Sequence, residues 1–197
     1  MKKFTFFFLI FIPTLLFSLG QKNDLIFSFE EQIFYVDDAI EKMNQINIFT
    51  MDDMETKEKI QLISETVDIL KSTLNTNSKN WELYNRLEKF SENNIKDCDN
   101  DKKFKDFFPE KIRNLIYQNV FIENHIKNML QQAQEIVTNF ETQKMPEVEY
   151  EKAKQLYIDN YEVLNDLILY HREEMKWMMS LIEELKLGYI YETKRIL

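Results

Sequence analysis

"LYIDNYEVLNDLILYHREEMKWMMSLIEEL", residues 156–185, places apolar and aromatic side chains at alternating intervals of three and four residues. This spacing puts them on one side of an α-helix, whereas a half-buried β-strand alternates at every second residue. A helix that starts after Pro146 and carries this spacing towards the C-terminal residues has roughly 45 residues and is about 70 Å long. We call such a series the seam of a helix, and here it consists of Tyr150, Ala153, Tyr157, Tyr161, Leu164, Ile168, His171, Met175, Met178, Ile182, Leu185 and Tyr189.

The same spacing predicts helices in the N-terminal half. Residues 26–43 are predicted to form the first helix. The spacing at 60–74 predicts the second, which is expected to begin near Thr50 and to end at the polar sequence NTNSKN at 75–80. A third, shorter helix is expected at about 79–93. The N-terminal half is therefore predicted to contain three shorter helices.

A fourth helix is predicted to start near Pro109, because proline lacks the N–H that the first helical turn leaves unpaired. Its seam contains one polar residue, Asn119, of the kind that fixes the alignment of packed helices at some cost in stability. The fifth helix is expected to start after the sequence TQKMP at 142–146. So short a connection requires the fourth and fifth helices to run antiparallel.

The chain after position 20 contains few of the residues that form tight turns, because only Gly188 and two prolines occur there. The patterns together predict an all-α fold, an elongated bundle of four to five helices dominated by a long antiparallel C-terminal hairpin at 109–197. The shorter helices occupy 21–96 and an acidic loop occupies 97–108. Residues 21–197 are predicted to form a single all-helical domain.

The N-terminal sequence predicts export. Lys2 and Lys3 precede an apolar run that ends in Ser-Leu-Gly at 18–20, which is the order of features in a secretory signal peptide. We therefore predict a signal peptide at 1–20 and a protein that is periplasmic, on the cell surface or secreted. The alternative is an uncleaved anchor that contacts a membrane through residues 4–19 and makes the protein a periplasmic or surface strut.

Charge and cysteine content narrow the classes of partner. The chain has 25 basic and 34 acidic residues, a net charge of −9, and this balance argues against nucleic-acid binding. Cys98 is the only cysteine, so an intrachain disulfide is excluded. An intermolecular disulfide at Cys98 stays open.

The loop that contains Asp97, Asp99 and Asp101 is the strongest candidate for a metal site. The loop resembles an EF-hand calcium loop, in which these carboxylates would stand at positions 1, 3 and 5. The resemblance is partial, because Lys102 stands where the loop needs glycine and Phe108 where it needs a glutamate. A solvated acidic loop is the favoured interpretation, and a calcium-responsive or metal-dependent protein is the alternative.

Other candidates for chemistry are weaker. His171 and Glu174 lie one helical turn apart, but a di-iron bundle uses the order Glu-x-x-His on two helices, and the other histidine, His125, lacks that spacing. His171 lies on the seam, so we predict that it fills a layer of the core. No nucleophile turn or phosphate-binding loop occurs in the sequence. We expect no enzyme activity and no cofactor, and we assign no catalytic, cofactor-binding or metal-binding residue.

Tyr170, Trp177 and Met179 do not belong to the seam and form a second apolar set on the last helix. They either pack against the first three helices or meet another chain. Elimination and shape together favour a non-enzymatic helical protein that acts by protein–protein interaction, as a scaffold, adhesin-like or chaperone-like module. The partner protein is not identified by the sequence, and a homo-oligomer is compatible with it.

Overall fold

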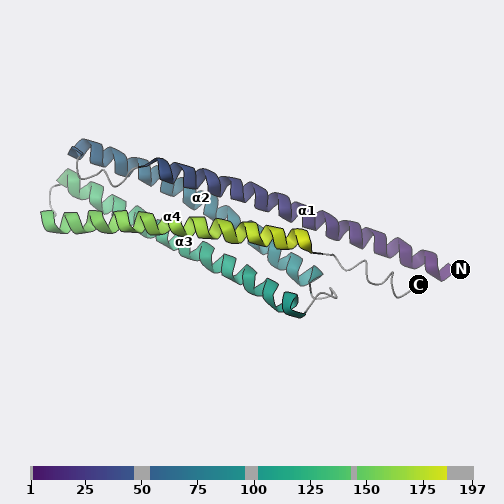
Figure 1. Ribbon diagram of the computed structural model, residues 1–197. Helices are drawn as coiled ribbons and strands as arrows, with labels where there is room; N and C mark the ends of the chain where they lie inside the picture. Colours follow the sequence, from purple (N-terminus) through teal and green to yellow (C-terminus); the bar gives the residue numbers. More distant parts are fainter. Residues whose placement is uncertain (1, 47–53, 96–101, 143–145, 186–197) are drawn as a thin grey trace. The chain divides into compact units, whose positions relative to one another are not determined.

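The computed structural model describes the backbone of residues 2–46, 54–95, 102–142 and 146–185, and their side chains except those of 2–18, 56, 102–104, 140–141 and 147. Four α-helices account for nearly all of these residues (Figure 1): α1 Lys2–Gln45, α2 Thr56–Asn94, α3 Lys102–Thr142 and α4 Glu147–Glu184. The described ranges contain no strand. The predicted all-α bundle of four to five helices is therefore confirmed.

The second and third predicted helices are one continuous helix, α2, of 39 residues. The prediction that 75–80 ends a helix was wrong. Asparagine, serine and threonine have low helix propensity, but each costs less than about 0.7 kcal/mol relative to alanine, and tertiary packing overrides such penalties. Asn77 and Asn80 are buried, and the Ser78 hydroxyl donates to the Asn75 carbonyl at 2.7 Å. The N-terminal half consequently contains two long helices instead of three shorter ones.

Helix α3 starts at Lys102, before the start predicted at Pro109. The described part of the predicted acidic loop at 97–108 is helical, so the loop is shorter than expected. A proline inside a helix removes one backbone hydrogen bond and costs about 3 kcal/mol. The added turns bury Phe108 completely and bring Phe107 into an aromatic contact, and this burial of apolar surface offsets the cost.

Helix α4 begins directly after Pro146, as the sequence predicts. The Glu149 and Tyr150 amides donate to the Pro146 carbonyl at 2.9 and 3.0 Å, which closes the first turn. The predicted continuation of this helix to Tyr189 lies outside the described residues.

Contacts between the helices divide the chain into two compact units. Unit 1 consists of Met1–Glu31, Trp81–Ile116 and Glu174–Leu197, and unit 2 of Gln32–Asn80 and Tyr117–Glu173. Each helix contributes a segment to both units, so each unit is itself a four-helix bundle. That residues 21–197 form a single domain stays a prediction.

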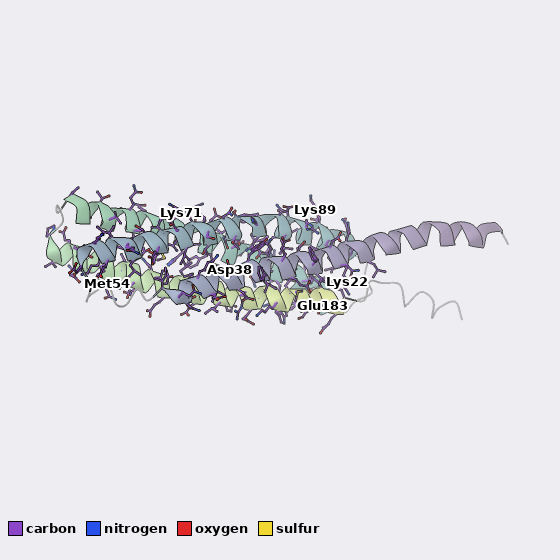
Figure 2. All side chains as sticks on the ribbon, turned by 90° about the horizontal axis from the view of Figure 1, so that it is seen from above. Lys22, Asp38, Met54, Lys71, Lys89 and Glu183 are labelled. Carbon is purple, nitrogen blue, oxygen red and sulfur yellow. The ribbon has the colours of Figure 1, made fainter. Side chains whose placement is uncertain are left out.

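In unit 1, α1 is tied to the end of α4. The Lys22 ammonium donates to the carbonyls of Glu183 at 2.6 Å and Leu185 at 3.1 Å (Figure 2). The last carbonyls of a helix have no partner within that helix, and a cation there also matches the negative end of the helix dipole. Leu25 and Phe29, on the same helix as Lys22, are buried in the core.

In unit 2, each helix contacts the next one along the chain. The Lys79 ammonium of α2 lies 5.0 Å from the centre of the Tyr35 ring of α1. The Asn77 side chain of α2 donates to the Asn119 carbonyl of α3 at 3.0 Å. Within this unit the ribbon of α2 runs antiparallel to those of α1 and α3 (Figure 1).

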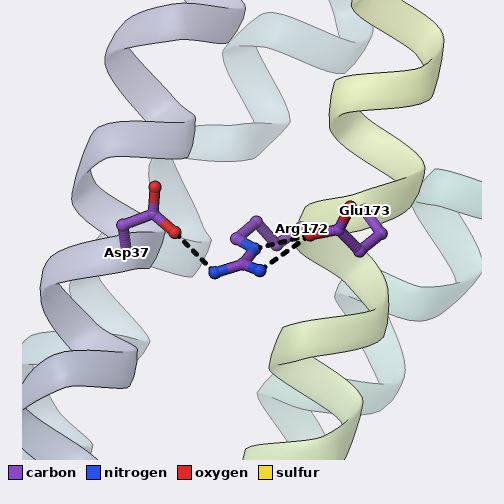
Figure 3. Close-up of polar contacts among 3 residues, drawn as sticks. All are labelled: Asp37, Arg172 and Glu173. Atoms are coloured by element: carbon purple, nitrogen blue, oxygen red, sulfur yellow. Dashed lines mark hydrogen bonds and ion pairs between the residues drawn. The ribbon is translucent and has the colours of Figure 1, made fainter.

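Helix α4 closes unit 2 against α1. The Arg172 guanidinium donates to Asp37 of α1 at 2.9 Å and to Glu173 at 2.7 and 2.9 Å (Figure 3). The hydrogen bonds to Glu173 and Asp37 raise the pKa of Arg172 above its usual value. The Tyr161 hydroxyl of α4 donates to the Met43 carbonyl of α1 at 3.0 Å. Unit 2 is thus an up-down-up-down bundle.

Three buried asparagines, Asn77, Asn80 and Asn119, form a cluster in the core of unit 2. Asn80 Nδ2 donates to Asn119 Oδ1 at 3.1 Å, and Asn77 supplies the bond to the Asn119 backbone already described. Asn80 Oδ1 and Asn119 Nδ2 have no hydrogen-bond partner among the described atoms. Losing either of the two amide bonds would leave further buried polar atoms unpaired, so the bonds favour one alignment of α2 and α3.

This cluster predicts a coupled effect on stability. Asn80→Leu or Asn119→Leu leaves the other amide without its partner, so each should lower the free energy of unfolding by about 1–3 kcal/mol. The double variant removes both groups, and its loss should be smaller than the sum of the single losses by about 1 kcal/mol or more. Urea unfolding followed by circular dichroism measures all three, and strictly additive losses would contradict the coupling.

Candidate functional site

Polar contacts in unit 2 fix the alignment of α3 against α4. His125 Nε2 donates to the Asn160 carbonyl at 2.9 Å, and the Asn160 amide donates to Gln132 Oε1 at 3.0 Å. Further along, His171 Nδ1 donates to Gln118 Oε1 at 2.9 Å. The 125–160 and 118–171 pairs place the residues between 118 and 125 of α3 opposite those between 160 and 171 of α4.

An exposed apolar surface flanks this line of contacts. Its members are Phe121, 57% exposed, on α3, and Leu156, 51%, Val163, 47%, and Tyr170, 56%, on α4. The three α4 residues are spaced by seven, which is two helical turns, so they lie on one side of the helix. We call these four residues the α3/α4 stripe.

Neighbouring residues show that both parts of the stripe lie on the side where α3 and α4 meet. Asn160, which contacts α3, is four residues after Leu156 and three before Val163, so it lies on their side of α4. On α3, the Phe121 ring stacks with His125, which contacts α4, at a centroid distance of 6.4 Å. The α3/α4 stripe is therefore one surface formed by two helices.

Acidic side chains accompany the stripe along α4. Asp159, Asp166 and Glu173 each stand three residues after a stripe residue and are exposed. At about 100° per residue, this offset puts the row of acids on the side of the stripe that faces away from Asn160, and hence from α3. Asp159 accepts a hydrogen bond from neutral Gln155 at 2.7 Å, and it forms no ion pair with the described residues.

The opposite flank of the stripe, on α3, is uncharged. The exposed residues nearest to Phe121 along the outer side of α3 are Tyr117, one turn before it, and Asn124, three residues after it. Negative charge therefore borders the stripe on the α4 side and not at these two positions on α3.

The predicted apolar set of Tyr170, Trp177 and Met179 divides between the two units. In unit 1, the Trp177 ring meets Phe107 edge to face at 5.3 Å and lies under the Lys111 ammonium at 4.6 Å. Met179 is half-buried. Trp177 therefore packs within the chain, but its partners belong to α3 and not to the first three predicted helices, whereas Tyr170 in unit 2 stays exposed.

The residues considered for metal chemistry are distributed as follows. Asp97, Asp99, Asp101 and Cys98 lie outside the described residues. His171 is 1% exposed and fills a layer of the core, as its place in the seam predicts. Within the described ranges, no three side chains of histidine, cysteine, aspartate or glutamate are grouped so that they could hold a metal ion. Glu174, in unit 1, pairs with Lys111 at 3.4 Å.

Burial makes His171 sensitive to acid. It lowers the pKa of His171 from 6.5 to about 4. The unfolded chain then binds the proton more readily than the folded one, so the stability that neutral His171 contributes is complete above pH 6.5 and is lost as the pH falls towards 4.

We therefore predict that the wild type loses up to about 3 kcal/mol more stability than His171→Gln between pH 6.5 and 4. Chemical unfolding at a series of pH values measures the difference, and the carboxylates common to both proteins cancel in it. The difference should be constant between pH 7.5 and 9. Parallel stability curves down to pH 4 would show that His171 does not resist protonation.

Leu156, Val163 and Phe121 escaped the sequence prediction, which considered only aromatic residues and methionines of the last helix as a binding surface. One signal was available: the pattern of an apolar residue followed three positions later by an acid occurs three times at an interval of seven, as Leu156 with Asp159, Val163 with Asp166 and Tyr170 with Glu173. The place of Phe121 beside this pattern has no signal in the sequence, because it depends on how α3 is aligned with α4.

Comparison with known proteins gives no function for this chain, so a function has to be argued from the geometry of the helices. No family model, no curated protein and no solved structure matches the chain. Among the helices whose side chains are described, none combines the length and apolar character needed to cross a membrane.

Proposed function

We propose that the chain is an exported, non-enzymatic helical protein that acts by protein–protein interaction in the cell envelope or outside the cell, as a scaffold, adhesin-like or chaperone-like module. The observation that carries the proposal is the α3/α4 stripe. Export rests on Lys2, Lys3, the apolar run after them and the small residues at 18–20.

The stripe supports binding because its side chains are large, are about half exposed and lie on one side of the α3–α4 pair. Covering the exposed part of each should contribute about 1 kcal/mol at 25 cal/mol per Å². Single exposed apolar residues are ordinary on protein surfaces, whereas a contiguous set with a polar rim is typical of an interaction site. Tyrosine and phenylalanine are also enriched in interface cores.

The two histidines, the side chains best suited to acid–base chemistry in the described ranges, have structural roles. His171 is buried and donates to Gln118, and His125 donates to a backbone carbonyl of α4. Each of them is used to hold α3 against α4. The surface, rather than a pocket with acid–base groups, is therefore the part of unit 2 that we assign to function.

Export predicts the mass of the mature protein. Cleavage after Gly20 should give a chain that starts at Gln21, since Ser-Leu-Gly supplies the small residues that precede a cleavage site. Intact-mass and N-terminal peptide spectrometry of the protein from its native cells measures this. A chain that retains residues 4–19 would favour the membrane-tethered alternative.

The interaction surface predicts a position-specific crosslink. A photo-reactive phenylalanine analogue in place of Tyr170 should give a discrete adduct with another protein in the native cells, because Tyr170 lies within the surface that we expect a partner to cover. The same analogue at Ser72, an exposed residue of α2 in the same unit, is the matched control. Equal adducts from both positions, or none from Tyr170, would refute the role of the stripe.

A further inference from the structure

We infer that the α3/α4 stripe binds an amphipathic α-helix of a partner protein that carries lysine or arginine along one flank of its apolar side. The inference rests on the proposed function and names its partner class. Three observations support it: the spacing of the stripe residues, the charges beside them, and the poor match of a second copy of the chain or of a membrane to those charges.

The period of the stripe matches a helix. Leu156, Val163 and Tyr170 repeat every seven residues, which corresponds to about 10.5 Å along α4. A partner helix that crosses α4 at a shallow angle presents apolar side chains at the same interval. An extended strand presents side chains on one face at about 6.6 Å, so only some of them would meet a stripe residue.

The charges beside the stripe select a basic flank. Asp159, Asp166 and Glu173 follow the same seven-residue period, so a partner helix in register with the stripe passes all three. Glu173 also binds Arg172, which leaves Asp159 and Asp166 as the stronger attractions. On the α3 side of the stripe, Tyr117 and Asn124 are uncharged, so basic residues are needed on only one flank of the partner helix. This asymmetry of charge sets the orientation of the partner helix on the stripe.

A second copy of the chain is a poor occupant. In a two-fold dimer the same surface meets itself, so the acidic rows of both copies would enter one interface. Like charges in that position are unfavourable, and the whole chain carries a net charge of −9. A membrane surface is also a poor match, because helices that bind anionic lipid carry basic residues beside their apolar side, and here the row is acidic.

Binding of two synthetic helical peptides to the full chain tests the inference. Both have leucine at the first and fourth positions of three heptads. One has lysine along one flank and the other has glutamate there. The lysine peptide should bind about tenfold more tightly at low salt, since two or three exposed ion pairs supply that difference, and the preference should shrink as salt rises. Fluorescence anisotropy of labelled peptides measures both affinities.

Variants of the chain separate the two parts of the site. Asp159→Asn/Asp166→Asn should remove most of the preference for lysine, whereas Glu65→Gln/Asp68→Asn, which makes the same change of charge on exposed positions of α2, should keep it. Val163→Ser/Tyr170→Ser should abolish binding of both peptides. All these positions are exposed, and circular dichroism of each variant checks that the helical fold is retained.

The remaining outcomes overturn the inference. Equal affinity for the two peptides would refute the charge selection. Absence of peptide binding, together with a crosslink from Tyr170 in cells, would refute a helical partner and leave the proposed function standing, whereas loss of both would refute both. Self-association abolished by Tyr170→Ser would assign the stripe to a second copy. Binding to phosphatidylcholine vesicles abolished by the same change would assign it to a membrane.

Discussion

Burial of the helix seams is the constraint on which the rest of the structure depends. Each helix carries an apolar side that it cannot bury alone, and with Cys98 as the only cysteine no intrachain disulfide can replace that burial. The α4 seam is buried at Tyr157 and Tyr161 in unit 2 and at Met175 and Ile182 in unit 1. Local propensity yields to this constraint: α2 continues through a run of poor helix formers, and α3 includes a proline, because in both places the helix gains buried side chains.

Seam burial alone does not choose one alignment of the helices. A seam repeats every seven residues, so sliding one helix by two turns brings apolar residues together again. Buried polar pairs break this degeneracy, because a slide would strand them without partners. In unit 2 the Asn80–Asn119 bond does this for α2 and α3, and the His171–Gln118 bond does it for α3 and α4. The stripe depends on these bonds, since the second of them sets which part of α4 lies opposite Phe121.

Most of the fold could be predicted from the sequence, because seam spacing is a direct consequence of helical geometry. The all-α class, the antiparallel C-terminal pair and the buried His171 all follow from it. The ends of helices could not be predicted at 75–80 and near Pro109, since local signals there compete with burial that depends on other helices. The candidate site was accessible only in part: the period of Leu156, Val163 and Tyr170 is visible along the chain, but the contribution of Phe121 requires the alignment of two helices.

The acids beside the stripe explain how α4 keeps apolar residues on its surface. An exposed apolar row on a helix promotes non-specific association, and charged neighbours at the same period oppose it. The pattern holds for three successive repeats in unit 2 and stops at Trp177, which is followed three residues later by Ser180 instead of an acid. In unit 1, Trp177 is 37% exposed and packs against Phe107 and the Lys111 ammonium. Along α4, acids therefore accompany the three apolar residues that are about half exposed and do not accompany Trp177, which the chain covers in part. This is expected if the stripe is kept open for a partner that can match both its apolar and its charged period.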